Sequence, residues 1–309
     1  ADAVRVARLR ADAVAAFRTG RLDPDAPAAA GERTAREELE SRGFSTAFIR
    51  RFFTPFFGGV FLERSLDTAA TVFLFDFATF SLGSACLPRG GMAAIPAQLA
   101  AALPASSLML GARVRGVAPG RVELADGETL TADHVVVATD LAAAAAILPP
   151  EHAGAWVARA AKPTRLVAFA AERSPLATRT LVVSAEEDGP IDNLTVPSDV
   201  AEDYAPPGAA LVQVSVRGDW QGGPATLPDA IRSQATTWFG TDVSGWRHLA
   251  TVEVPHALPD ESPAARRLRP AGPRLAQGLF LCGDHCGSAS INGALASGRR
   301  CAAALLATA

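Results

Sequence analysis

The spacing of apolar residues near the C-terminus predicts a buried strand, a loop and a packed helix. The apolar run 278–282 ends at Gly283 and Asp284, at the kind of strand end where open α/β sheets bind nucleotides. Apolar residues then return at near-helical spacing, at Ile291, Leu295, Ala302 and Leu305. Ser288 or Ser290 could cap this helix, and a helix N-terminus attracts phosphate groups. This segment is therefore the first candidate for a binding site.

Earlier patterns predict the remainder of an α/β unit. Alternating apolar residues predict short strands at 110–117, 121–125 and 129–131, with a hairpin turn at Asp126-Gly127. A helical run at 93–103 precedes these strands. The stretch 133–140 is continuously apolar in its middle, which is typical of a strand buried on both faces.

The rest of the chain follows two other patterns. Residues 1–86 have a helical pattern, interrupted by a polar, proline- and alanine-rich loop that we expect to be exposed at 23–30. Between residues 146 and 272 the pattern predicts an antiparallel sheet that is covered by a helix at 228–239. The strands of this sheet are expected at 165–170, 181–184, 211–216 and 248–254.

Composition favours a two-domain enzyme and excludes several other classes. The 309 residues exceed the size at which one core usually stops growing, and 49% of them are hydrophobic. The net charge of −3, with arginines spread along the chain, gives no nucleic-acid-binding patch. No apolar run has the length of a membrane-spanning helix, and no signal peptide is visible. We therefore expect a cytoplasmic protein without a nucleic-acid partner.

Cysteine and histidine spacings argue against metal or thiol chemistry. Cys282 and Cys286 flank Gly283-Asp284 without the C-x-x-C spacing of a redox pair, so we interpret them as small buried residues. The five histidines lack metal-ligand spacing, and no G-x-S-x-G motif supports a serine hydrolase. We expect no metal site.

Four stretches, in matching order, resemble the flavin-containing amine oxidase and phytoene desaturase superfamily. Residues 278–298 are similar to its C-terminal signature, residues 88–92 to its P-x-GG-M motif, and residues 135–139 to its VVVAT strand. The fourth set, landmarks at 204–208, Trp246 and 256–259, resembles the substrate domain of the desaturase-like branch. The resemblance implies an FAD-dependent oxidoreductase. Its fold class would be α/β and α+β, with a Rossmann-like FAD/NAD(P)-binding domain interleaved with a substrate domain of antiparallel sheet plus helices.

The same resemblance divides the chain into four segments. Residues 1–86 would be the helical part of the substrate domain, and residues 87–145 a segment of the FAD-binding domain. Residues 146–272 would form the sheet and helices of the substrate domain. Residues 273–309 would return to the FAD-binding domain as its last strand and helix.

The resemblance also implies which residues contact FAD. They lie at the P-x-GG-M motif, on the strands of the cofactor domain and at the C-terminal signature: Gly90, Gly91, Met92, Val114, Ala138, Thr139, Gly283, Asp284, Ser290, Ile291, Asn292 and Ala294.

One motif of the superfamily is missing. Its members open with a strand, a G-x-G-x-x-G turn and a helix that together cradle the pyrophosphate, and no such motif occurs in this sequence. We infer that the chain is an N-terminally truncated form. We therefore expect FAD in the complete protein, but weak or no FAD binding and no activity in residues 1–309.

Phenylalanine is concentrated in one region. Eleven of the fifteen lie between residues 44 and 80, at Phe44, Phe48, Phe52, Phe53, Phe56, Phe57, Phe61, Phe73, Phe75, Phe77 and Phe80. Such a stripe can be plain core, but in desaturase-like relatives it would line the path of an apolar substrate and could touch a membrane peripherally.

Two features favour the phytoene desaturase-like branch. Monoamine-oxidase-like members place a tyrosine just before the helix that covers the flavin, and this chain has Ser288-Ala289-Ser290 there. The single tyrosine, Tyr204, lies in a proline-rich loop, so no tyrosine pair can form an amine cage. The expected substrate is therefore a prenyl- or carotenoid-like molecule, with amine oxidation as the alternative.

Arg165 is the candidate catalytic residue. It begins a substrate-domain strand where relatives place a basic residue near the flavin, and a guanidinium there would stabilise negative charge on reduced flavin. Lys162, the only lysine, is the second choice. A solvent-exposed arginine without a catalytic role explains Arg165 equally well.

Two readings from other classes stay open. The chain could be a non-catalytic remnant that binds a lipid or a protein partner through its phenylalanine-rich region. It could also be a subunit that a separate N-terminal chain completes. The sequence does not choose between these, and it does not give the oligomeric state.

Overall fold

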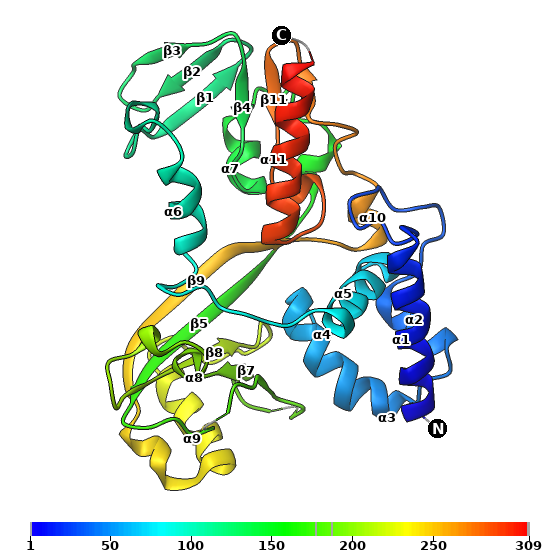
Figure 1. Cartoon of the computed structure of the whole chain (residues 1–309), viewed down its shortest axis with the longest axis vertical. Helices are drawn as coiled ribbons and strands as arrows, with labels where there is room; N and C mark the ends of the chain where they lie inside the picture. Colours follow the sequence, from blue (N-terminus) through cyan, green and yellow to red (C-terminus); the bar gives the residue numbers. More distant parts are fainter. Residues whose placement is uncertain (1, 177, 187, 308–309) are drawn as a thin grey trace.

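The chain folds into three lobes that two long strands connect (Figure 1). The computed structural model describes residues 2–176, 178–186 and 188–307. A helical lobe contains residues 2–82, a sheet lobe lies at the opposite side, and a C-terminal lobe holds the last strand and helix (Figure 1). The expected combination of α/β and α+β structure is confirmed.

The helical lobe packs around phenylalanine rings. Its elements are α1 (Asp2–Arg18), α2 (Ala35–Ser41), α3 (Thr46–Phe48), the π-helix η1 (Ile49–Phe53), α4 (Thr54–Phe61) and α5 (Ala70–Leu82). The helical pattern expected for residues 1–86 is therefore confirmed over residues 2–82. Thr34 and Glu37 form a capping box that fixes the start of α2.

The phenylalanines of this lobe form a packed core, the Phe cluster. Its fully buried rings meet largely edge to face, as Phe57 and Phe73 do at 4.8 Å between centroids. Phe52 and Phe80 lie at the margin with exposed fractions of 42% and 51%. The inner rings are buried and pack against one another, so they form part of the hydrophobic core of this lobe.

The C-terminal lobe contains two small sheets. The first is the antiparallel meander β1 (Val114–Ala118), β2 (Arg121–Leu124) and β3 (Thr129–Thr131), as the sequence predicted. The second has the order β10-β11-β4, built from β4 (Val135–Val137), β10 (Arg274–Ala276) and β11 (Leu279–Leu281). Strands β4 and β11 run parallel, and Val135 lies opposite Leu279. Helices α7 (Leu141–Ile147) and α11 (Ile291–Leu306) complete the lobe.

The expectation that the 133–140 strand is buried on both faces is wrong. Val135 and Val137 are buried, but Val136 is 41% exposed. In the described part of the chain β4 pairs with β11 alone, so it forms one edge of its sheet. A continuous apolar run in the sequence therefore does not show whether both faces of a strand are covered.

Helix α6 (Ala94–Ala101) forms where the 93–103 run predicted a helix, but it stands apart from the other elements (Figure 1). None of its residues is buried. Leu99, Leu103 and Leu110 are 54%, 51% and 91% exposed. The surface around α6 is therefore apolar and open to solvent.

The sheet lobe is one five-stranded antiparallel sheet with the order β6-β7-β8-β5-β9. Its strands are β5 (Ala161–Ala171), β6 (Val182–Val183), β7 (Ile191–Thr195), β8 (Ala210–Val216) and β9 (Arg247–Pro259). Helices α8 (Pro197–Val200) and α9 (Leu227–Phe239) accompany it. The four predicted strands and the α9 helix are confirmed. Strand β7 was missed, because Asp192 and Asn193 interrupt its apolar pattern.

Short helical turns connect these elements. They are η2 (Ala105–Ser107), η3 (Ala155–Ala158), η4 (Glu202–Tyr204), η5 (Gly240–Gly245), α10 (Pro263–Arg266) and η6 (Asp284–Cys286). Across the described residues, none of the helices combines the length and apolar character needed to cross a bilayer.

Candidate functional site

The strand-end turn, residues 283–288, follows β11 at the carboxyl ends of the parallel pair. The amide of Cys282 still donates to the carbonyl of Val137 at 2.9 Å, so the two strands end together. Gly283 has φ 150°, and a Cβ atom there would lie 2.6 Å from the His285 ring. Only glycine fits this position. The chain can therefore turn sharply and place Asp284 directly beyond the strand ends, as the sequence predicted.

The turn offers unused polar groups. The Asp284 carboxylate is 29% exposed and, within the described residues, accepts no hydrogen bond; the nearest cation donor is His285 Nδ1 at 3.7 Å. The Ser290 hydroxyl caps α11 by accepting from the Gly293 amide at 2.9 Å. The amides of Ile291 and Asn292 have no acceptor among the described residues. A carboxylate and two helix-end amides suit a ligand with hydroxyl and phosphate groups.

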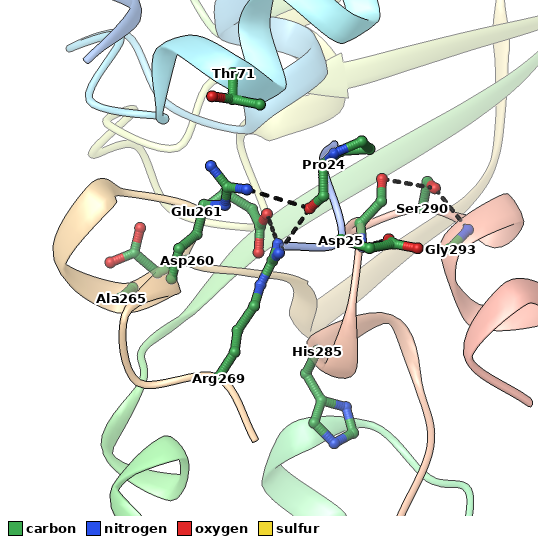
Figure 2. Close-up of polar contacts among 12 residues, drawn as sticks. Pro24, Asp25, Thr71, Asp260, Glu261, Ala265, Arg269, His285, Ser290 and Gly293 are labelled. Carbon is green, nitrogen blue, oxygen red and sulfur yellow. Dashed lines mark hydrogen bonds and ion pairs between the residues drawn. The ribbon is translucent and has the colours of Figure 1, made fainter. Parts of the chain in front are cut away.

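His285 belongs to the core and not to this open face. Its ring is fully buried and stacks on Trp156 with 5.7 Å between centroids. Neither ring nitrogen has a hydrogen-bond partner in the described structure. Figure 2 shows the ring directed away from Ser290 and Gly293. Asp284 and His285 are therefore adjacent in sequence but differ strongly in exposure, at 29% and 0%.

Contacts from distant parts of the chain hold the turn at three atoms. Arg159 Nη1 donates to the His285 carbonyl at 2.6 Å. On the other side, the Ser288 amide donates to Asp25 Oδ1 at 2.7 Å. The Gly283 amide donates to Ser297 Oγ at 3.1 Å. These contacts come from three separate segments, so the position of the turn depends on tertiary structure.

Arg159 belongs to an arginine cluster, which consists of Arg159, Arg266 and Arg269. All three side chains are at most 1% exposed. Arg159 and Arg269 both pair with Glu261, which is 2% exposed, and Arg266 pairs with Glu32 at 3.0 Å. Burying a charge costs free energy unless it is paired. Each guanidinium here has a carboxylate partner, although the buried Nε atoms of all three arginines have no hydrogen-bond partner in the described structure.

The arginine cluster also fixes the 23–30 loop. Arg269 donates to the Pro24 carbonyl at 2.6 Å, and Arg266 donates to the Ala26 carbonyl at 2.7 Å (Figure 2 shows the Arg269 contact). The expectation of an exposed loop is therefore only partly right: Asp23 to Ala30 is a loop, but its first half is anchored inside. This anchoring is what places Asp25 against Ser288.

A cleft of about 370 Å³ opens between α4 and the sheet lobe, the α4–β5 cleft. Its lining includes Glu63, Arg64, Lys162 and Asp192. The Lys162 ammonium pairs with Glu63 at 2.5 Å and lies 3.9 Å from Asp260. Since the Asp260 carbonyl accepts from Arg159 at 2.9 Å, a short chain of contacts joins this cleft to the strand-end turn.

Asp192 is an under-satisfied carboxylate in the cleft. The residue is 7% exposed, and its contacts with Arg64 and with the Asn193 amide are both long, at 3.4 Å. Burial raises the pKa of Asp192 above its usual value, and the nearby Arg64 guanidinium opposes this shift. A positively charged or hydrogen-bond-donating ligand would complete its partners.

The predicted site residues 90–92 make their hydrogen bonds to another part of the chain and not to the strand-end turn. The Gly90 amide donates to Asp203 at 2.7 Å, and the Tyr204 hydroxyl donates to the Pro88 carbonyl at 2.9 Å. No hydrogen bond joins this segment to the strand-end turn within the described chain. Gly90 and Gly91 both have positive φ, which explains two consecutive glycines here.

The structure gathers most of the other predicted residues in the C-terminal lobe. Ala138 and Thr139 follow β4, and the Thr139 carbonyl lies 3.1 Å from the position of a Gly283 Cβ. Val114 begins β1 and packs on the core beneath β4 and β11. Asn292 and Ala294 lie in the first turn of α11. The turn after β11 and the start of α11 hold four more of the predicted residues, Gly283, Asp284, Ser290 and Ile291.

Arg165 lies elsewhere, on β5. It pairs with Glu253 of the adjacent strand at 3.0 Å and is 28% exposed. It lines a second depression together with Trp220 and Pro255. It is not among the residues that line the α4–β5 cleft. Of the two basic candidates, Lys162 is the one that lines this cleft and contacts Asp260.

Sequence reasoning missed the residues that support the turn: Arg159, Asp25, Glu261 and Arg269. Charged residues in sequence signal solvent exposure, and these are buried or partly buried. One signal was available, since the stretch 260–269 places two carboxylates beside three arginines. Nothing in the local pattern links that stretch to residue 159 or to residue 25.

The cysteines give no sign of redox chemistry. Cys282 is buried as expected, but Cys286 is only half-buried, so the expectation of a buried residue is wrong there; Cys301 is buried. Burial raises the pKa of Cys286 to about 12 and of Cys301 to about 11. The thiols are therefore protonated at neutral pH. Among the described residues, no three His, Cys, Asp or Glu side chains are grouped so that they could hold a metal ion.

Comparisons with known proteins agree with this geometry. A model of the flavin containing amine oxidoreductase family matches residues 3–306. No curated protein is significantly similar in sequence.

Solved structures share the fold at low identity. Putrescine oxidase bound to putrescine is 14% identical with a TM-score of 0.74, over 98% of this chain and 75% of the other. The PF1083 protein from Pyrococcus furiosus is 14% identical with a TM-score of 0.71, over 94% and 70%. Cyclohexylamine oxidase from Brevibacterium oxydans is 16% identical with a TM-score of 0.65, over 89% and 67%. Since the family match spans nearly the whole sequence, the chain belongs to the flavin containing amine oxidoreductase family.

Proposed function

We propose that this protein is an FAD-dependent oxidoreductase whose substrate occupies the α4–β5 cleft. The observation that carries the proposal is the contact chain from Lys162 through Asp260 and Arg159 to the strand-end turn. This contact chain connects a charged cleft to a strand end of the kind at which open α/β sheets bind nucleotides.

The residues at the turn fit FAD. The Asp284 carboxylate is free to accept hydrogen bonds from cofactor hydroxyls, and the amides of Ile291 and Asn292 are free to donate. Bound flavin would supply a two-electron acceptor for a hydride from a substrate C–H bond. The protein's own part is to hold the substrate, to orient it and to exclude water. Lys162 would place a positive charge at the cleft wall.

The cleft favours a nitrogen-bearing substrate. Its lining carries the carboxylates of Glu63, Asp192 and Asp219, and Asp192 lacks a close partner. A protonated amine would supply that partner, whereas a hydrocarbon would leave the buried carboxylate unsatisfied. The amine substrates named for putrescine oxidase and cyclohexylamine oxidase are consistent with this choice.

An apolar, isoprenoid-like substrate is the second candidate. Its support is the aromatic surface at the margin of the Phe cluster, where Phe52 and Phe80 are exposed and both contact the Phe56 ring. A long hydrocarbon laid there would gain roughly 25 cal/mol for each Å² removed from water. Peripheral membrane contact through this surface belongs to the same proposal.

Substrate oxidation separates the two candidates. Natively purified protein, assayed against amines and isoprenoids with oxygen and quinone acceptors, should turn over amines. Asp192→Asn should raise the KM for a cationic amine about tenfold, since a charged hydrogen bond is lost. Glu253→Gln, which changes an exposed carboxylate that borders the neighbouring depression and not this cleft, is the matched control. Turnover of isoprenoids alone would select the second candidate.

Flavin retention tests the turn. Asp284→Ala should deplete bound flavin, because a hydrogen bond to a charged group contributes about 1.5–3 kcal/mol. Asp133→Ala, at the opposite end of β4, should retain it. Equal flavin content in both variants would show that Asp284 does not contact the cofactor.

The affinity of residues 1–309 for FAD stays a separate prediction. Since this sequence has no G-x-G-x-x-G motif, we expect weak binding, and calorimetric titration measures it. Submicromolar affinity would contradict the expectation.

A further inference from the structure

The strand-end turn has little conformational rigidity of its own. Gly283 and Gly287 bracket it, and glycine loses more backbone freedom on ordering than any other residue. Its internal hydrogen bonds are the Cys286 amide to the Gly283 carbonyl at 3.1 Å and the Gly287 amide to the Asp284 carbonyl at 3.2 Å. A single turn with such contacts requires support from outside to hold the Asp284 carboxylate in one place.

That support comes from both sides of the turn. Arg159 holds the His285 carbonyl, one residue beyond Asp284, and Asp25 holds the Ser288 amide. A Cβ atom on Gly287 would lie 2.8 Å from both Asp25 and Arg300, so the turn fits tightly against this second contact. The two contacts enclose the middle of the turn.

Both contacts trace back to one buried carboxylate. Glu261 pairs directly with Arg159 at 2.9 Å. It also pairs with Arg269, whose guanidinium anchors the Pro24 carbonyl beside Asp25, as Figure 2 shows. The Arg159 guanidinium also donates to the Asp260 carbonyl. It therefore fixes the chain beside Lys162, which lines the α4–β5 cleft.

We infer that Arg159 and Asp25 are positioning residues that clamp the strand-end turn, and that Arg159 sets its distance from the α4–β5 cleft. The inference rests on the proposed function for its purpose, since the clamp matters when Asp284 receives the flavin. Lysine cannot replace Arg159, because the ammonium is a compact point charge without the planar fork that reaches three acceptors.

Amide exchange in flavin-free protein tests the clamp directly. Arg159→Lys should speed hydrogen exchange at the Cys286 and Gly287 amides about tenfold, since the turn opens when its charge-assisted contact is lost. The matched control is Arg42→Lys, which changes a partly buried arginine of the helical lobe that pairs with Asp12 and Glu38 and, among the described residues, forms no hydrogen bond or ion pair with residues 23–30 or 283–288. Equal exchange in Arg159→Lys and wild type, or equal acceleration in the control, would overturn the clamp.

Asp25→Ala gives a second, milder test. This side chain is 30% exposed, so its removal is less damaging to the fold than a change in the arginine cluster. It should accelerate exchange at the Ser288 amide, and an unchanged rate would remove Asp25 from the proposal.

FAD titration separates the clamp from the proposed function. In the complete protein, Arg159→Lys should weaken FAD binding about tenfold and change the visible circular dichroism of bound flavin, whereas the control Arg42→Lys should change neither. No saturable binding by natively purified wild type would overturn the flavin assignment, while the exchange result would still decide on the clamp.

Discussion

The Phe cluster and the arginine cluster are neighbours that differ in what holds them together. They meet where the Ala69 amide, at the edge of the Phe cluster, donates to the Glu261 carbonyl at 2.9 Å. The inner rings of the first and the three arginines of the second are nearly free of solvent. In the Phe cluster a central ring such as Phe57 contacts several others, which also contact one another, so the loss of one ring leaves the rest in contact. In the arginine cluster each charge depends on a particular partner, and the loss of one leaves a buried charge unpaired.

The largest expected effect comes from removing the shared carboxylate. Glu261→Gln should lower the free energy of unfolding by about 3–5 kcal/mol, because Arg159 and Arg269 lose their common counter-ion inside the protein. Urea unfolding measures the change. Glu253→Gln, whose side chain is 61% exposed, should leave stability unchanged. A small effect for Glu261 would mean that the arginines repack without it.

The next effect concerns Asp76 of α5, between the two clusters. Burial, and secondarily the charge of Glu261, raise the pKa of Asp76 to about 7. Because the folded pKa lies above the unfolded one, the neutral form stabilises the fold at low pH, and this stability is lost as pH rises from about 4 to about 7. Asp76→Asn should remove that dependence and make the variant more stable than wild type at pH 8, by on the order of 3 kcal/mol. Parallel unfolding curves at pH 5 and pH 8 test the sign.

A substitution inside the Phe cluster should cost less. Phe57→Leu keeps most of the apolar volume, so we expect a loss of about 1–1.5 kcal/mol in the free energy of unfolding. Phe52→Leu, at the exposed margin, should cost less still. If Phe57→Leu destabilised the protein as much as Glu261→Gln, the Phe cluster would not tolerate substitution better than the arginine cluster.

The smallest effect is expected at Arg165. Its pair with Glu253 lies at the surface, so Arg165→Gln should change stability by less than about 0.5 kcal/mol. The same variant tests the catalytic role that the sequence suggested. A large fall in kcat with unchanged stability would restore Arg165 as a functional residue.

The sequence predicted elements whose cause is local. The β1–β2–β3 meander, α9 and the β11–α11 junction follow from apolar spacing, turn residues and a serine cap. The position of Asp284 at the strand end was predicted for the same reason, since a carboxylate after a glycine at the end of an apolar run is a short-range signal. Strand β7 escaped because it buries Asp192, which no propensity predicts.

The support of the site could not be predicted, because its partners are far apart in sequence. Arg159 meets Glu261 across 102 residues, and Asp25 meets Ser288 across 263. The sequence does not show whether an arginine or aspartate side chain is exposed to solvent or buried. Only the fold shows that these charges are enclosed and that the 23–30 loop is anchored.

The open edge of β4 has a consequence for handling the protein. A short apolar strand with unpaired backbone groups on one side is a template for association between molecules at high concentration. Natural edges are often protected by a lysine that repels a second chain. A charge at Val136, the exposed centre of this edge, would therefore improve colloidal behaviour and shelf life without disturbing the buried side of the sheet.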